Sequence, residues 1–95
     1  MRTLNPFTVY LNAVDPIAQQ HDLTEVLAGV YWALKNNAED FPVIPGYKTL
    51  RMVKTDSVRG IPALRIIFRI VDDKEVALHW IEVASTDEYQ GPPIL

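Results

Sequence analysis

Two predominantly apolar runs of residues, 64–71 and 75–83, give the strongest structural signal in this chain. Both are rich in β-branched and aromatic residues, which favour β-strands. The polar residues 72–74 between them are typical of a turn, so the two runs predict a β-hairpin. Alternate side chains of a strand point to opposite faces. One face of the first strand is therefore apolar and the other basic; the apolar face has Leu64, Ile66, Phe68 and Ile70, and the other has Arg65, Ile67 and Arg69.

The second run is apolar on both faces, which is typical of a central strand of a sheet. Its two faces are Val76, Leu78 and Trp80 on one side, and Ala77, His79 and Ile81 on the other. A histidine in such a strand is more often a hydrogen-bonded core residue than a general base. If the hairpin closes at residues 72–74, however, His79 can lie near the arginine face and act in acid–base chemistry. Both interpretations stay open at this point.

A helix is predicted from Asp22 to the Asn36-Asn37 pair. Asp22 followed by Glu25 resembles a capping box, in which both side chains satisfy free N–H groups of the first turn. Phe41-Pro42 ends any continuation, because proline disfavours a helical residue before it. The apolar positions recur every three or four residues and form one stripe along the helix. They are Leu23, Val26, Leu27, Val30, Tyr31 and Leu34.

The remaining pattern completes an α+β arrangement. Residues 7–14 alternate and predict a first strand, after which Asp15 and Pro16 begin a short helical turn that reaches Gln20. Residues 47–54 predict a second strand. The expected fold is an antiparallel sheet in the order β-α-β-β-β, with a short extra helical turn before the main helix and that helix packed on one face. The contact should join Val26, Leu27, Val30 and Leu34 to Leu64, Ile66, Phe68 and Ile70.

The size and composition of the chain narrow its class. With 95 residues we expect one domain spanning 1–95. The chain has no cysteine, so it has no disulfide and no thiolate metal site, which fits a cytoplasmic protein. No apolar run approaches membrane-spanning length, and the first residues lack the pattern of a secretory signal. The two histidines are far apart with no carboxylate pattern between them, so we expect no metal and no cofactor.

Charge is unevenly distributed along the chain. The net charge is −3, but residues 46–74 hold seven of the nine Lys/Arg residues and three acids, a local balance of +4. A basic patch is the footprint of a polyanionic partner. The same residues can equally be the solvated sides of two strands, and charge alone favours neither interpretation.

Three stretches of this sequence resemble the RelE/ParE family of type II toxins. The first is the segment 45–51, which begins Pro45-Gly46-Tyr47. The second is the segment 60–70, where Gly60 precedes Arg65 and an aliphatic-aromatic strand. The third is the valine-containing strand 75–81, followed by Asp87-Glu88-Tyr89. The order of predicted elements also matches over residues 22–89.

The resemblance implies a role for several basic residues. In ribosome-dependent members of the family the sheet holds messenger RNA, basic residues bind phosphates, and an arginine stabilises the transition state as a 2′-OH attacks the next phosphate. By this resemblance the catalytic residues would be Arg65 and Tyr89, and Lys48, Arg51 and Lys54 would bind nucleic acid or a partner. Its position in the hairpin adds His79 to the catalytic candidates, and the basic stretch adds Arg59 and Arg69 to the binding candidates. We expect Arg65 to be exposed and functional, with little effect on stability. Glu82 is expected to be exposed.

One departure from the family pattern bears on activity. Members often have an arginine shortly before the closing tyrosine, and this chain has Ala84-Ser85-Thr86 there. Three function classes therefore remain: a toxin that cuts ribosome-bound RNA, a ParE-like inhibitor of a protein target without hydrolytic chemistry, and a degenerate or orphan interaction module. The first two imply a cognate antitoxin, whose acidic or amphipathic segment would cover the surface of Arg51, Arg65 and Arg69. The first also implies the ribosome and messenger RNA as partners.

Overall fold

The computed structural model describes residues 1–91 and has an α+β fold, as the sequence predicts. Its elements in order are β1 (Thr3–Pro6), α1 (Thr8–Gln20), α2 (Thr24–Asn37), the 3-10 helix η1 (Ala38–Asp40), β2 (Leu50–Lys54), β3 (Leu64–Ile70) and β4 (Glu75–Val83). The strands form one four-stranded sheet in the order β1-β4-β3-β2. β1 runs parallel to β4 while the other neighbours are antiparallel, so the sheet is mixed rather than wholly antiparallel.

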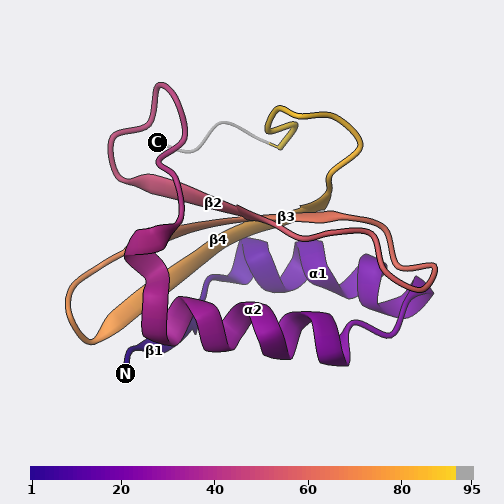
Figure 1. The fold of residues 1–95 in the computed structure, drawn as a ribbon, viewed down its shortest axis with the longest axis horizontal. Helices are drawn as coiled ribbons and strands as arrows, with labels where there is room; N and C mark the ends of the chain where they lie inside the picture. Colours follow the sequence, from indigo (N-terminus) through magenta and orange to yellow (C-terminus); the bar gives the residue numbers. More distant parts are fainter. Residues whose placement is uncertain (92–95) are drawn as a thin grey trace.

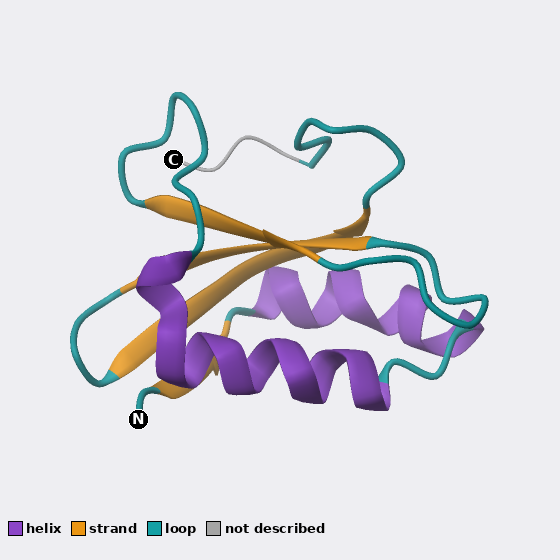
Figure 2. Ribbon diagram, in the orientation of Figure 1, coloured by secondary structure: helices purple, strands orange, loops and turns teal. Residues whose placement is uncertain are grey.

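The molecule has a helical layer below the sheet and a layer of loops above it. Both helices cover the lower face, and the connections around β2 and after β4 rise over the other face (Figures 1 and 2). We call this second face the upper face. Within residues 1–91, neither helix is long and apolar enough to cross a membrane. The upper face carries Leu50, Met52, Lys54, Arg65, Ile67, Arg69, Ala77, Trp80 and Glu82.

The main core lies between the helices and the lower face of the sheet. Val30 and Leu34 of α2 are buried in one cluster with Leu64, Ile66 and Phe68 of β3, and the half-buried members Val26, Leu27 and Ile70 pack against it. The predicted contact between the helical stripe and the hairpin is therefore confirmed. A second, smaller cluster on the upper face contains Ile44, Leu50 and Ile67, with Tyr47, Met52, Trp80 and Tyr89 packed against it.

The predicted first strand over residues 7–14 is wrong, because this segment belongs to α1. Its core-facing residues are spaced three and four apart rather than two, and they are Tyr10, Ala13, Val14 and Ile17. Val9 and Leu11, which suggested alternation, are exposed. Pro16 lies inside α1 rather than at a helix start, and the short helical turn predicted there is a full helix of 13 residues. The edge strand β1 lies just before it.

The second helix begins slightly later than expected. α2 starts at Thr24, and the Asp22 side chain accepts a hydrogen bond from the Thr24 backbone N–H at 3.1 Å. The helix ends at Asn37, as predicted. β2 begins at Leu50 rather than at Tyr47, because residues 42–44 fold back along its outer edge and pair there with Leu50, Arg51 and Met52.

The hairpin of β3 and β4 is confirmed, but its register contains a β-bulge. Ile67 pairs with Trp80 while Phe68 pairs with Leu78, so His79 is an extra residue in β4. A bulge reverses the alternation beyond it. Ile81 therefore joins Val76 and Leu78 in the main core, and Trp80 turns to the upper face. The faces predicted for Trp80 and Ile81 are corrected accordingly.

Candidate functional site

Three of the predicted site residues meet in one hollow on the upper face. Lys48, Arg69 and His79 line a space of about 240 Å³ together with Tyr47, Thr49 and neighbouring backbone. Arg69 comes from β3 and His79 from the bulge of β4, whereas Lys48 comes from the loop before β2. The sheet register thus places two side chains far apart in the sequence in a shared basic pocket.

The strand neighbours of Arg69 offer its guanidinium no side-chain acceptor. Its cross-strand neighbours are Leu50 in β2 and Ala77 in β4, neither of which carries an acceptor in its side chain. Among residues 1–91, Arg69 Nε is buried and makes no hydrogen bond. Buried polar groups are normally hydrogen-bonded, so this atom is an exception, and Arg65 Nε shares the same feature.

His79 has a similar unsatisfied atom. Its ring contacts Phe7 edge to face, with the ring centroids 4.6 Å apart. Its Nε2 is buried and has no partner among the described residues. Burial, and secondarily the nearby charge of Arg69, lowers the pKa of His79 below its ordinary value of 6.5. The imidazole is therefore neutral at pH 7, with one donor and one acceptor nitrogen.

These features are chemically compatible with an anion held beside a neutral imidazole. Arg69 offers a planar guanidinium, whose geometry suits phosphate, and Lys48 adds a second positive charge at the rim. In the part of the chain that the structure describes, no cluster of three or more potential metal ligands occurs. The hollow can thus hold an oxyanion through fixed cations, with His79 available to a neighbouring hydroxyl group.

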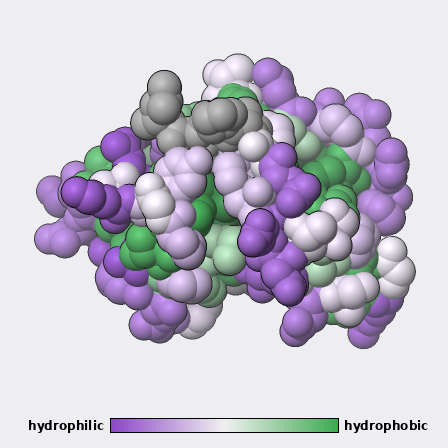
Figure 3. All heavy atoms as spheres, turned by 90° about the horizontal axis from the view of Figure 1, so that it is seen from above, coloured by the Kyte–Doolittle hydropathy of each residue, from purple (hydrophilic) through white to green (hydrophobic). Residues whose placement is uncertain are grey.

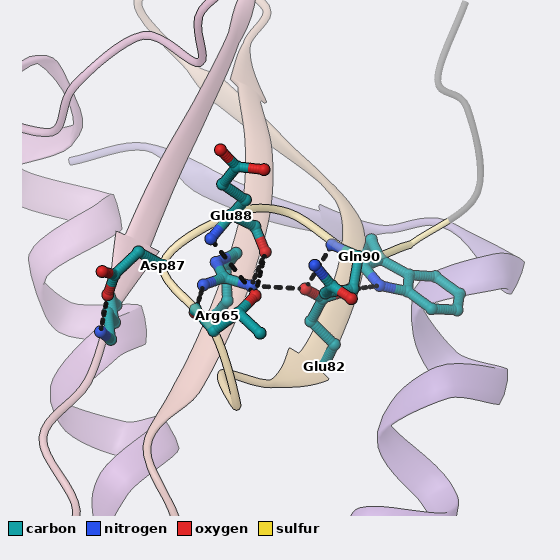
Figure 4. A network of polar contacts seen from close by, with 8 residues as sticks. Arg65, Glu82, Asp87, Glu88 and Gln90 are labelled. Atoms are coloured by element: carbon teal, nitrogen blue, oxygen red, sulfur yellow. Dashed lines mark hydrogen bonds and ion pairs between the residues drawn. The ribbon is translucent and has the colours of Figure 1, made fainter.

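Arg65 is in a different environment and corrects the expectation of an exposed side chain. It is fully buried, although it lies on the upper face four residues from Arg69. Its Nη1 donates to Glu82 Oε2 at 2.6 Å and to the backbone oxygen of Glu88 at 2.7 Å, and its Nη2 donates to the backbone oxygen of Thr86 (Figure 4). These contacts join β3 to β4 and to the segment that follows β4.

Glu82 is the residue of this network that sequence reasoning missed. It was expected to be exposed, but its side chain is only 11% exposed. Oε1 accepts the indole N–H of Trp80 at 2.8 Å, and Oε2 accepts the backbone N–H of Gln90 at 2.9 Å besides the bond from Arg65. The bulge at His79 is what places Glu82 directly opposite Arg65.

Residues 84–91, which we call the strap, lie over the sheet on its upper side (Figures 1 and 4). Asp87 of the strap forms an ion pair with Lys54 of β2 at 3.5 Å. Tyr89 packs into the upper cluster, and burial, followed by the charge of Glu82, raises the pKa of Tyr89 to about 12. Its hydroxyl therefore stays protonated at neutral pH and is unsuited to act as a base.

Arg51 and Arg59 do not join the other cations. Arg51 lies on the helical side of the sheet, opposite Phe68, and donates to the backbone oxygens of Glu39 at 3.2 Å and Phe41 at 2.7 Å. Arg59 is at a distant turn, where it has a φ of 51°, and borders a hollow that Asp22 also lines. The expected common surface of Arg51, Arg65 and Arg69 is therefore corrected, because the three guanidinium groups lie in three different environments.

A larger hollow of about 630 Å³ lies between β1 and the two helices. Its walls are mainly apolar and include Leu4, Leu11 and Leu27, with the hydrogen-bonded hydroxyl groups of Tyr10 and Tyr31 nearby. None of the predicted site residues lines it. The smaller hollow on the upper face is the better candidate, because ionisable groups with unsatisfied atoms converge there. Viewed from above, this face shows hydrophilic side chains between apolar patches (Figure 3).

Comparison with known proteins does not assign the chain to a family. No protein-family model matches it, and no curated protein shows significant similarity to it. Any functional conclusion therefore depends on the residues and geometry of the upper face.

The pKa of His79 gives a direct test of this site. We expect a proton NMR titration of its ring to show a pKa below 6.5. Arg69→Ala should raise that pKa, because it removes a nearby positive charge that opposes protonation. Added inorganic phosphate should also raise it, because a bound anion favours the imidazolium. His79→Gln assigns the signal by deleting it. A His79 pKa unaffected by both Arg69→Ala and phosphate contradicts the shared pocket.

The same shift has a consequence for stability. Because the folded-state pKa of His79 lies below the unfolded value of about 6.5, the unfolded chain binds more protons between these two values. His79 thus contributes a loss of stability as the pH falls from about 6.5 through the folded pKa, and none above this window. Comparison of urea unfolding for the wild type and His79→Gln across this pH range isolates the effect.

Proposed function

We propose that this chain is the toxin component of a RelE/ParE-like toxin–antitoxin system and that it binds RNA through the hollow of Lys48, Arg69 and His79. The single observation that carries the RNA-binding proposal is that Lys48, Arg69 and His79 line one hollow, and that no acidic side chain lines it with them among residues 1–91. The observed order of a strand, two helices and three strands supports the family resemblance at the level of element order.

RNA fits the two kinds of group that meet here. The guanidinium of Arg69 and the ammonium of Lys48 can hold a phosphate, as charge-assisted hydrogen bonds do in many phosphate sites. The neutral imidazole of His79 can pair with a ribose 2′-OH, which is both donor and acceptor and distinguishes RNA from DNA. The proposed ligand is therefore a single-stranded RNA segment, with one phosphate at Arg69 and the adjacent ribose at His79.

The position of Arg65 favours binding over cleavage. Catalysis of phosphodiester cleavage by 2′-OH attack needs a cation at the reacting phosphate, and the family resemblance gave this role to Arg65. That side chain is fully buried, and its contacts are to Glu82 and to the backbone of the strap. The proposed activity is accordingly RNA binding, and cleavage is an outcome that the experiment distinguishes.

Arg69→Ala should weaken binding of a short fluorescent single-stranded RNA by about 10- to 100-fold, because hydrogen bonds to charged groups contribute about 1.5–3 kcal/mol. Fluorescence anisotropy at low salt measures the dissociation constant. Arg59→Asn is the matched control, since it removes the same charge at a distant turn and asparagine tolerates positive φ. Equal losses for the two variants, or no binding by the wild type, contradict the proposed RNA site.

Further readouts separate the function classes. The same RNA incubated with the protein and run on a denaturing gel reveals cleavage, and intact RNA supports binding alone. A DNA of the same sequence should bind more weakly, and His79→Gln should reduce this preference.

Expression in a bacterial host tests toxicity; growth arrest without RNA binding would favour inhibition of a protein target. Recovery of a small partner protein encoded by an adjacent gene tests the antitoxin.

A further inference from the structure

We infer that the strap, residues 84–91, is an internal competitor of RNA that closes part of the upper face and must lift to extend the binding site. This inference rests on the proposed RNA binding, and it concerns the regulation of that site. Three polar contacts of the strap converge on Arg65 and Glu82 of the underlying hairpin.

The strap contacts the other two cations of the upper face, Arg65 and Lys54. Arg65 and Lys54 are cross-strand neighbours at one end of the sheet, while Arg69 lies four residues further along β3. This spacing is about 13 Å at the usual rise of a strand. Thr86 and Glu88 occupy the Arg65 guanidinium through their backbone oxygens, and Asp87 pairs with Lys54. In the closed state, therefore, Arg69 and Lys48 are left to bind a phosphate.

The strap also lies in the path of an RNA strand that leaves the hollow at Arg69. A second hollow of about 380 Å³ is bordered by Tyr47 and Met52 on the sheet side and by Asp87, Glu88 and Tyr89 of the strap. Tyr47 lines both this hollow and the one at Arg69, so the two are neighbours. An RNA that extends past Tyr47 meets two carboxylates, whose charge repels phosphate. RNA and the closed strap are thus electrostatically opposed.

The end of the strap offers a way to open it without changing charge. Gly91 lies against two rings: a Cβ added there would be 2.5 Å from Trp80 Nε1 and 2.5 Å from Tyr89 Cε1, closer than real Cβ contacts allow. Tyr89 belongs to the strap itself, so the contact that opposes the strap is the one with Trp80. We expect Gly91→Ala to push the end of the strap away from the Trp80 ring and so to lift it. Gly29→Ala is the matched control, because it makes the same change on α2 with nothing within 4 Å of the added atom.

The experiment compares strap opening with RNA affinity in the full chain. Hydrogen exchange at the Gln90 amide, which donates to Glu82, reports opening. Gly91→Ala should speed this exchange and tighten binding of a short single-stranded RNA about tenfold, whereas Gly29→Ala should change neither. Reciprocally, RNA should speed the exchange of strap amides in the wild type, since two linked equilibria affect each other equally.

Each result bears on the proposal. Faster exchange with unchanged RNA affinity shows that the strap does not compete, and the RNA site at Arg69 then stands without it. RNA that slows strap exchange makes the strap part of the binding surface and overturns the inference. Exchange in Gly91→Ala no faster than in Gly29→Ala shows that the strap does not lift under this strain and also overturns it. If no variant binds RNA, including one with an open strap, the proposed function itself fails.

Discussion

Replacing Arg65 with alanine is expected to destabilise the protein by about 3–5 kcal/mol, because the change leaves a buried carboxylate without its partner. Arg65 is fully buried and Glu82 is nearly buried, and Arg65 Nη1 lies 2.6 Å from Glu82 Oε2. The alanine also removes the donors to the backbone oxygens of Thr86 and Glu88. Urea unfolding followed by tryptophan fluorescence measures the loss, and Trp80 lies next to the affected network.

Arg69→Ala is the matched control for this prediction. It removes the same side chain from the same face of β3, where the guanidinium makes no hydrogen bond or ion pair within residues 1–91. Its effect on stability should stay within about 0.5 kcal/mol, as for most substitutions away from such networks. The two arginines should therefore separate cleanly, with Arg65 affecting stability and Arg69 affecting RNA binding. Equal stability losses for both, or none for Arg65→Ala, contradict this division.

A double substitution tests whether the Arg65–Glu82 pair itself stabilises the fold. Replacing a buried ion pair by apolar residues of similar size is often neutral or stabilising, because both desolvated charges disappear together. Arg65→Met combined with Glu82→Leu should then recover much of the stability that either single change loses. The strap should nevertheless open in the double variant, since the Gln90 amide loses its acceptor on Glu82.

The hairpin was predictable from sequence, but the partner of Arg65 was not. The alternation of β3 and the polar turn identify both strands and the apolar face correctly. If β3 and β4 paired regularly from Ile70 and Val76 onward, with no bulge, Arg65 would lie opposite Ile81. The extra residue at His79 shifts the pairing by one and brings Glu82 opposite Arg65 instead. No residue type in β4 marks a bulge, so alternation alone predicted an exposed, functional arginine.

The first helix was misread for a different physical reason. In the segment 7–14, apolar residues at every second position compete with a longer pattern of three- and four-residue steps that continues to Ile17. A short window favours the strand interpretation, and the full span favours the helix. Pro16 strengthened the error, because a proline is expected at the start of a helix more often than inside one.

The cations of the candidate site were predictable individually, but their grouping was not. Sequence placed Arg65 and Arg69 on one face, and this is confirmed by the register. Whether each one is free depends on its cross-strand neighbours, which are Ala77 for Arg69 and Glu82 for Arg65. Arg51 lies between Leu50 and Met52 in β2, so its side chain points to the opposite face, which is the helical side. The location of Lys48 depended on how the loop before β2 folds, for which local sequence carries little signal.

The largest loss of stability from an uncharged side chain should come from Phe68→Ala. Phe68 is fully buried between the sheet and the helices, and its ring meets that of Phe41 edge to face at 5.9 Å. Truncation of a buried phenylalanine costs about 3–5 kcal/mol through lost burial and the cavity that remains. Because Phe68 also adjoins the bulge, its loss should loosen the positions of Ile67 and Arg69.

Trp32→Ala provides the matched control for this last prediction, since it truncates a larger aromatic residue that is 60% exposed on α2. Its effect should stay within about 0.5 kcal/mol. Urea unfolding of both variants, followed by circular dichroism, gives the urea concentration at which each variant is half unfolded. A Phe68→Ala midpoint equal to that of Trp32→Ala contradicts the packing of α2 on the hairpin. If the packing is correct, Phe68→Ala should also weaken RNA binding at low urea, because the Arg69 hollow depends on a well-ordered β3.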